Sequence, residues 1–144
     1  MGASDHTSRW LCNRLRDMEH PTRKHDQRHL ARMRKICMAY PEVVEVEQFG
    51  NPWWKAGKKS FCIYGESDGQ QGAAFNLSPL DQSLLLGDPR FYKTGHIGQH
   101  GWTSMRFSGR IDWDQVEELV EIAYCCVALK RMLKALEASP RSQH

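Results

Sequence analysis

The sequence has no long hydrophobic run. Its uncharged apolar stretches are only a few residues long, such as 84–86, whereas a helix needs roughly 18 to 20 apolar residues to span a bilayer. The first residues, 1–6, also lack the basic-then-apolar order of a secretory signal. We therefore expect no membrane segment and a cytoplasmic protein.

The cysteines lack any motif spacing. There are five of them, an odd number, and no CxxC pair, which argues against a disulfide framework and a zinc site. Two histidine pairs, His25 with His29 and His96 with His100, have a four-residue spacing but no third ligand at a motif distance of the kind that HExxH supplies. We therefore predict reduced thiols and no metal site.

Catalytic motifs are also missing from the sequence. There is no GxSxG nucleophile turn, no GxxxxGK[ST] phosphate loop and no pair of carboxylates in a non-helical setting. We therefore predict a protein that is not an enzyme and that carries no cofactor. The alternative left open is an enzyme whose His and carboxylate converge only in space, with perturbed titration as its sign.

The length and the charge distribution suggest how the chain is organised. A chain of 144 residues with 40% apolar residues is large enough for one core. Residues 1–39 hold nine Lys or Arg but four Asp or Glu, whereas the whole chain has a net charge of only +3. This imbalance favours an anionic partner, most commonly nucleic acid. We expect a basic arm at 1–25, a single domain at 26–138 and a short tail at 139–144.

Hydrophobic periodicity predicts two long helices. Apolar residues recur at three- and four-residue steps over 26–39, with Asp26 placed to cap the helix and Pro41 placed to end it. A second helix is predicted over 112–136, with Asp112 as its cap.

Between these helices the pattern changes to short β-branched or aromatic stretches separated by turns that contain glycine. A short helical turn is expected at 81–86 and a loop at 91–99. The combination predicts an α+β fold, in which an antiparallel sheet of about five strands carries the N- and C-terminal helices on one face. The expected strands are 43–49, 53–56, 60–64, 72–77 and 102–107.

Short motifs occur in a characteristic order over roughly residues 30–133. They are Ile36–Glu42, Phe49–Trp53, Gly57–Phe61, Asp88–Phe91 and Gly98–Trp102, followed by Ile111–Trp113 and Ala123–Tyr124. In this order and spacing they resemble the MmcQ/YjbR family. The resemblance implies a compact fold similar to that of frataxin and CyaY, in proteins described as predicted DNA-binding proteins with a double-wing motif.

Four basic residues gather on one side of the first predicted helix, opposite its apolar face. A row of cations suits phosphate oxygens, which Arg and Lys bind without sequence preference. An ordinary solvated helix face is the alternative. We call these residues the basic stripe: Lys24, Arg28, Arg32 and Lys35.

A second basic cluster surrounds a tight turn next to Trp53 and Trp54. Adjacent strand residues face opposite ways, so one tryptophan is expected in the core and the other is expected to be more exposed. Lysines at such a turn suit a phosphate backbone, although they also serve to protect a sheet edge from pairing. We call Lys55, Lys58 and Lys59 the lysine hairpin.

DNA binding through the basic stripe and the lysine hairpin is the first hypothesis for function. The alternative is a small-molecule or peptide-binding module, with a pocket between the sheet and the loop at 91–102. That pocket is expected to be lined by Trp54, Phe91, Tyr92, His96, His100 and Trp102.

Overall fold

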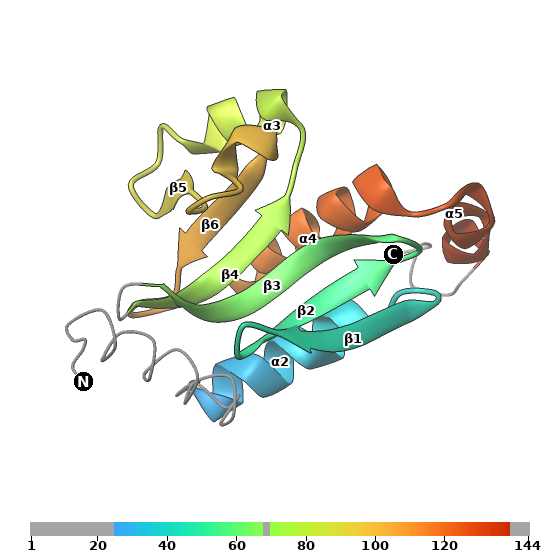
Figure 1. The fold of residues 1–144 in the computed structure, drawn as a ribbon, viewed down its shortest axis with the longest axis horizontal. Coiled ribbons are helices and arrows are strands. Elements are labelled where there is room, and N and C mark those ends of the chain that lie inside the picture. The colour runs from blue at the N-terminus through green and yellow to red at the C-terminus, as the bar shows by residue number, and fades with distance from the viewer. Residues whose placement is uncertain (1–24, 68–69, 139–144) are drawn as a thin grey trace, which may run out of the picture.

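The computed structural model describes residues 25–67 and 70–138, which form one antiparallel sheet with helices packed on it (Figure 1). The predicted arm, apart from His25, and the predicted tail lie outside the described residues. The strands are β1 (Val43–Gln48), β2 (Asn51–Ala56), β3 (Lys59–Ser67), β4 (Gln70–Asn76), β5 (Phe91–Lys93) and β6 (Trp102–Arg106), and the helices are α2 (Gln27–Met38), α3 (Pro79–Leu85), α4 (Trp113–Val127) and α5 (Lys130–Glu137). The predicted α+β class is confirmed.

The sheet has six strands in the order β1-β2-β3-β4-β6-β5, one more than expected. The additional strand is β5, which lies in the segment predicted as a loop and pairs Phe91 with Met105 and Lys93 with Thr103. It was missed because three residues are too few to show a period of two. The pairing matters for function because Phe91 and Tyr92 must face opposite sides of the sheet.

Helix α2 begins and ends close to where the sequence predicts. The Asp26 side chain accepts hydrogen bonds from the backbone N–H groups of Arg28 and His29, as expected of a cap. Its buried side contains Leu30 and Met33 and packs on the sheet. Among the residues in 25–67 and 70–138, no helix has both the length and the hydropathy needed to cross a bilayer.

The predicted C-terminal helix is two helices. The chain leaves α4 at Ala128, whose ψ of 148° is extended, and α5 begins after Leu129. The Leu129 side chain packs over Gly57 in the turn between β2 and β3, and the turn in direction allows Met132 to reach the core. No glycine or proline marks this break, so the apolar pattern alone predicted a continuous helix.

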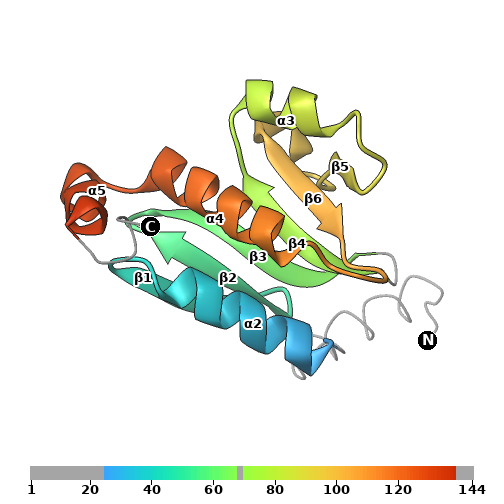
Figure 2. The same cartoon turned by 180° about the vertical axis from the view of Figure 1, so that it is seen from behind.

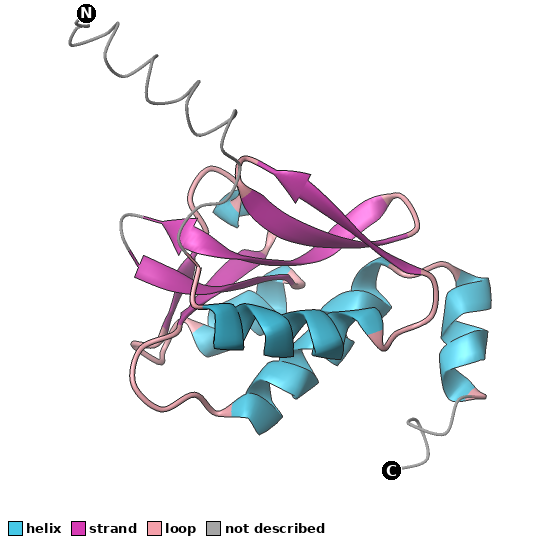
Figure 3. Ribbon diagram, turned by 90° about the horizontal axis from the view of Figure 1, so that it is seen from below, coloured by secondary structure: helices cyan, strands magenta, loops and turns pink. Residues whose placement is uncertain are grey.

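Helices α2 and α4 cover one face of the sheet, as predicted (Figure 2). Figure 3 shows the two long helices beneath the strands. The principal core lies between these layers, and its largest fully buried side chains are Trp54, Tyr64 and Tyr124. Strand alternation produces most of this core because alternate side chains of β1 to β4 face the helices. A register irregularity between β2 and β3 also brings the adjacent Phe61 and Cys62 into it.

The other side of the sheet, which faces the viewer in Figure 1, carries a second and smaller cluster. Ile63, Ala74 and Trp102 form this cluster, and Trp53 and Ile97 pack against it. Trp54 is fully buried in the principal core, whereas Trp53 lies half-buried on the opposite side. The expected division between the two tryptophans is therefore confirmed. We call this side of the sheet the open face.

Two tyrosine hydroxyls connect distant parts of the fold. The Tyr124 hydroxyl donates to the carbonyl of Pro41 at 2.8 Å, which joins α4 to the segment after α2. The Tyr64 hydroxyl donates to Oε1 of Gln71 at 2.6 Å, and the same oxygen accepts the backbone N–H of Asp26 at 2.7 Å. Burial is the main cause that raises the pKa of Tyr64 to about 12 and that of Tyr124 to about 12.

These pKa values predict a loss of stability at alkaline pH. An unfolded tyrosine titrates near pH 10, so between about pH 10 and 12 the unfolded state binds fewer protons than the folded state does. The free energy of unfolding should therefore fall as the pH rises through this window. Urea unfolding at a series of pH values measures the effect. The control is a Tyr64→Phe/Tyr124→Phe variant, which should be less stable at pH 8 but show a shallower fall; an equal fall would contradict the assignment.

Candidate functional site

A groove of about 670 Å³ lies between α2 and α4, on the outer side of the helical layer. It contains three cations of the basic stripe and a single carboxylate among its lining side chains. The lining residues are Arg28, Ala31, Arg32, Lys35, Ile36, Ala39 and Glu117. We call this the basic groove. Lys24, the fourth residue of the basic stripe, lies outside the described residues.

The position of Arg32 is set by an aromatic ring of the neighbouring helix. Its guanidinium carbon lies 4.6 Å from the centroid of the Trp113 ring, at the start of α4. A cation in this position is attracted by the face of the ring. Sequence reasoning missed Trp113 and Glu117 as neighbours of the basic stripe, because it placed them on a different helix without showing that the two helices meet.

The cations of the basic groove differ from the neighbouring Arg34. Arg34 donates two hydrogen bonds to Glu45, at 2.8 and 2.9 Å, and this contact lowers the pKa of the carboxyl. Within the described part of the chain, Arg28, Arg32 and Lys35 form no ion pair with a carboxylate. Their charges therefore remain available for an anion from solution.

The lysine hairpin occupies a different place. Lys58 and Lys59 are exposed at the turn between β2 and β3, and Lys55 is half-buried. This turn lies at the opposite end of the sheet from the N-terminus of α2 (Figure 1). The structure therefore does not bring the lysine hairpin and Arg28 into one compact site, and only an extended partner could contact both.

The prediction that one aromatic pocket joins Trp54 to Trp102 is wrong. Trp54 lies in the principal core, where its indole N–H donates to Glu45 at 2.9 Å, whereas Trp102 is on the open face. Phe91 also packs in the principal core, and Tyr92, the next residue of β5, is only partly buried. Strand alternation separates these side chains. The two predicted histidines, His96 and His100, are exposed.

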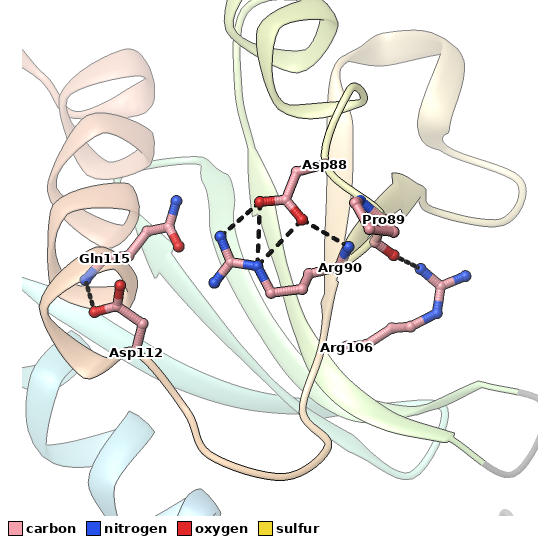
Figure 4. Close-up of polar contacts among 6 residues, drawn as sticks. All are labelled: Asp88, Pro89, Arg90, Arg106, Asp112 and Gln115. Carbon is pink, nitrogen blue, oxygen red and sulfur yellow. Dashed lines mark hydrogen bonds and ion pairs between the residues drawn. The ribbon is translucent and has the colours of Figure 1, made fainter.

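The motif Asp88–Phe91 shapes the connection between α3 and β5 (Figure 4). Asp88 accepts from the backbone N–H of Arg90 at 2.9 Å and from its Nη2 at 2.7 Å, and this contact lowers the pKa of the carboxyl. Arg106 donates to the carbonyl of Pro89 at 2.7 Å. These contacts use the polar groups of the motif within the fold, so we assign it a structural role.

Three of the described cysteine thiols are poor nucleophiles in this fold. Burial, followed by contact with Cys62, raises the pKa of Cys37. Partial burial also raises the pKa values of Cys125 and Cys126. A raised pKa keeps a thiol protonated at neutral pH. In the described part of the chain, no three His, Cys, Asp or Glu side chains gather as a metal site.

The fold and the site define a small α+β domain with a basic groove between two helices that cover one face of an antiparallel sheet. A family model, YjbR, matches residues 38–126, which is more than half of the chain. The chain belongs to the YjbR family, and the resemblance seen in its motifs is confirmed. The match begins at Met38, the last residue of α2, so the cations of the basic groove precede it. No match is found among curated proteins.

Proposed function

We propose that the protein binds DNA without catalysis, through phosphate contacts in the basic groove. The observation that carries the proposal is the unpaired state, among the described residues, of three cations that line one groove. Phosphate oxygens are the most common partners of such groups on nucleic acids, and Arg offers them a planar pair of donors.

The spacing of the three cations suits a phosphate backbone. The helix rises about 10 Å from Arg28 to Lys35, and one strand of duplex DNA carries a charge every ~3.4 Å along its axis. Three cations therefore extend over about the length of three phosphates. The Trp113 ring holds Arg32 in position before binding, which reduces the ordering needed when DNA arrives.

The lysine hairpin gives a second set of phosphate contacts. Lys58 and Lys59 are exposed and have no ion pair with any carboxylate in 25–67 or 70–138. Because they lie at the far end of the sheet, a duplex must be long enough to reach from the basic groove to this turn. The contacts of the basic groove and of the lysine hairpin are both to the phosphate backbone of DNA. We therefore expect the affinity to depend little on base sequence.

Fluorescence anisotropy of labelled duplex DNA over a series of salt concentrations tests the proposal. The variant Arg28→Gln/Arg32→Gln/Lys35→Gln should bind roughly 10 to 100 times more weakly at low salt. Its slope of log affinity against log salt should be shallower by about 2.7, the value for three lost phosphate contacts.

The matched control is Lys93→Gln/Lys130→Gln/Lys134→Gln, which removes three exposed cations from other surfaces. The control changes the net charge as much as the groove variant does. If binding is specific to the basic groove, the control should keep most of the affinity for DNA and the original salt slope. Equal losses of DNA affinity in the two variants would mean that net charge alone explains the binding. Absence of duplex binding by the unchanged protein at low salt would refute the proposed function.

A further inference from the structure

The open face carries aromatic rings and cations but no carboxylate among its described strand residues. Glu45 contacts Trp54 on the helical side, and Glu47 shares that side because it stands two residues further along β1. Glu66 shares the side of Tyr64 for the same reason. The acids of β1 and β3 therefore lie away from the open face, which favours an anionic partner.

A row of three aromatic rings crosses this face. The ring centroids of Phe49 and Trp53 are 6.5 Å apart, and those of Trp53 and Trp102 are 5.9 Å apart. Phe49, in the turn between β1 and β2, is 70% exposed, and Trp53 is partly exposed. Ile63 and Ala74 pack beside Trp102 and support the rings from the side of the sheet.

The indole N–H of Trp53 is buried and has no acceptor in the described part of the chain. Buried donors normally have a partner, so a donor of this kind in a native fold needs an explanation. An acceptor carried by a bound molecule is one explanation, and nucleobases and phosphates both carry such acceptors.

Cations lie on both sides of the aromatic row. Lys55 stands two residues from Trp53 on β2 and so faces the same way. Arg106, paired with Gly72, shares this face, and its guanidinium carbon lies 4.4 Å from the centroid of the Tyr92 ring. Gly72 in turn pairs with Gly65, and the Asn51 side chain lies over Gly65, so an amide stands beside Arg106 on this strip of the sheet.

We propose that the open face binds single-stranded nucleic acid, with bases stacked on Phe49 and Trp53 and phosphates near Lys55 and Arg106. Aromatic rings next to cations are the usual platform for an unpaired strand, because every base has a face that stacks. Bases within a duplex are already stacked on one another and are not free to use these rings. This site lies on the opposite side of the sheet from the basic groove. It shares Lys55 with the lysine hairpin but none of the residues of the groove, so it does not rest on duplex binding there.

Anisotropy of labelled 12-nucleotide oligo(dT) and oligo(U) tests this site. The variant Phe49→Ala/Trp53→Ala should bind the oligonucleotides at least about tenfold more weakly, as expected for the loss of one or two stacked bases. The two oligomers distinguish DNA from RNA as the preferred strand. The control is Leu80→Ala/Leu84→Ala, which removes two apolar side chains from α3 that are about as exposed as Phe49, at 69% and 72%, and it should bind as the unchanged protein does.

Phe49→Ala alone, at a highly exposed turn position, keeps the test valid if the double variant unfolds, and it should still weaken binding severalfold. The groove variant Arg28→Gln/Arg32→Gln/Lys35→Gln should lose duplex binding but keep oligo(dT) binding, so the two proposals fail separately. Unchanged affinity in Phe49→Ala/Trp53→Ala, or no binding by the unchanged protein at low salt, would overturn the inference. Self-association that this double variant abolishes would instead identify an interface between copies, and would also overturn it.

Discussion

Replacing Gly101 with alanine should lower the free energy of unfolding by about 3 kcal/mol. Gly101 has a φ of +97°, which L side chains rarely adopt. A methyl group there would also overlap the carbonyl oxygen of Leu77. That oxygen cannot easily retreat, because the N–H of Leu77 is bonded to the carbonyl of Gly101 at 3.3 Å. Urea unfolding followed by circular dichroism measures the loss.

Two other glycines separate backbone strain from overlap. Gly109 has a φ of +66° but no atom within 4 Å of an added methyl group, so Gly109→Ala should lose only about 1 kcal/mol. Gly95 has open space as well and no left-handed φ, so Gly95→Ala should leave stability unchanged or slightly raised. A loss at Gly101 no larger than at Gly109 would show that the overlap with Leu77 is relieved cheaply.

Replacing Trp54 with alanine should lower the free energy of unfolding by about 3 to 5 kcal/mol. The side chain is fully buried, so its removal leaves a large cavity between the sheet and the helices. Glu45 also loses the indole N–H as a donor, although Arg34 remains bound to it. The free energy of unfolding of Trp54→Phe should lie between those of the unchanged protein and Trp54→Ala. Phenylalanine fills most of the space but cannot donate a hydrogen bond to Glu45. Chemical denaturation of both variants provides the comparison.

The adjacent tryptophan is the natural control. Trp53 is only partly buried and belongs to the smaller cluster, so Trp53→Ala should lose about 1 kcal/mol. The two substitutions remove the same atoms one residue apart, and a difference between them reports burial together with the hydrogen bond from Trp54 to Glu45. Similar losses at both positions would mean that the open face contributes as much to the core as the helical face does.

Local patterns in the sequence were sufficient for much of the fold. Asp26 and Pro41 bracket α2, and both act over a few residues, so its limits could be predicted closely. The opposite orientation of Trp53 and Trp54 follows from strand geometry in the same way. The α+β class required only the order of helices and strands.

The parts that could not be predicted depend on contacts between distant segments. Strand β5 forms by pairing with the edge of β6, and the break between α4 and α5 places Leu129 over Gly57. The site shows the same limit: the basic stripe could be predicted from helical spacing, but its stacking on Trp113 requires α4 to pack beside α2. The local spacing of residues along the sequence does not reveal such tertiary contacts.

The contact between Leu129 and Gly57 bears on the proposed phosphate contacts of the lysine hairpin. It fastens the turn that carries Lys58 and Lys59 to the joint between α4 and α5, and Arg131 of α5 is in turn held by Glu42, which precedes β1. A turn that is restrained by such contacts before binding loses less conformational entropy when it binds a ligand. If the lysine hairpin contacts phosphates as proposed, the C-terminal helices help to set the position of Lys58 and Lys59, and loss of the Leu129 contact should weaken DNA binding without removing a charge.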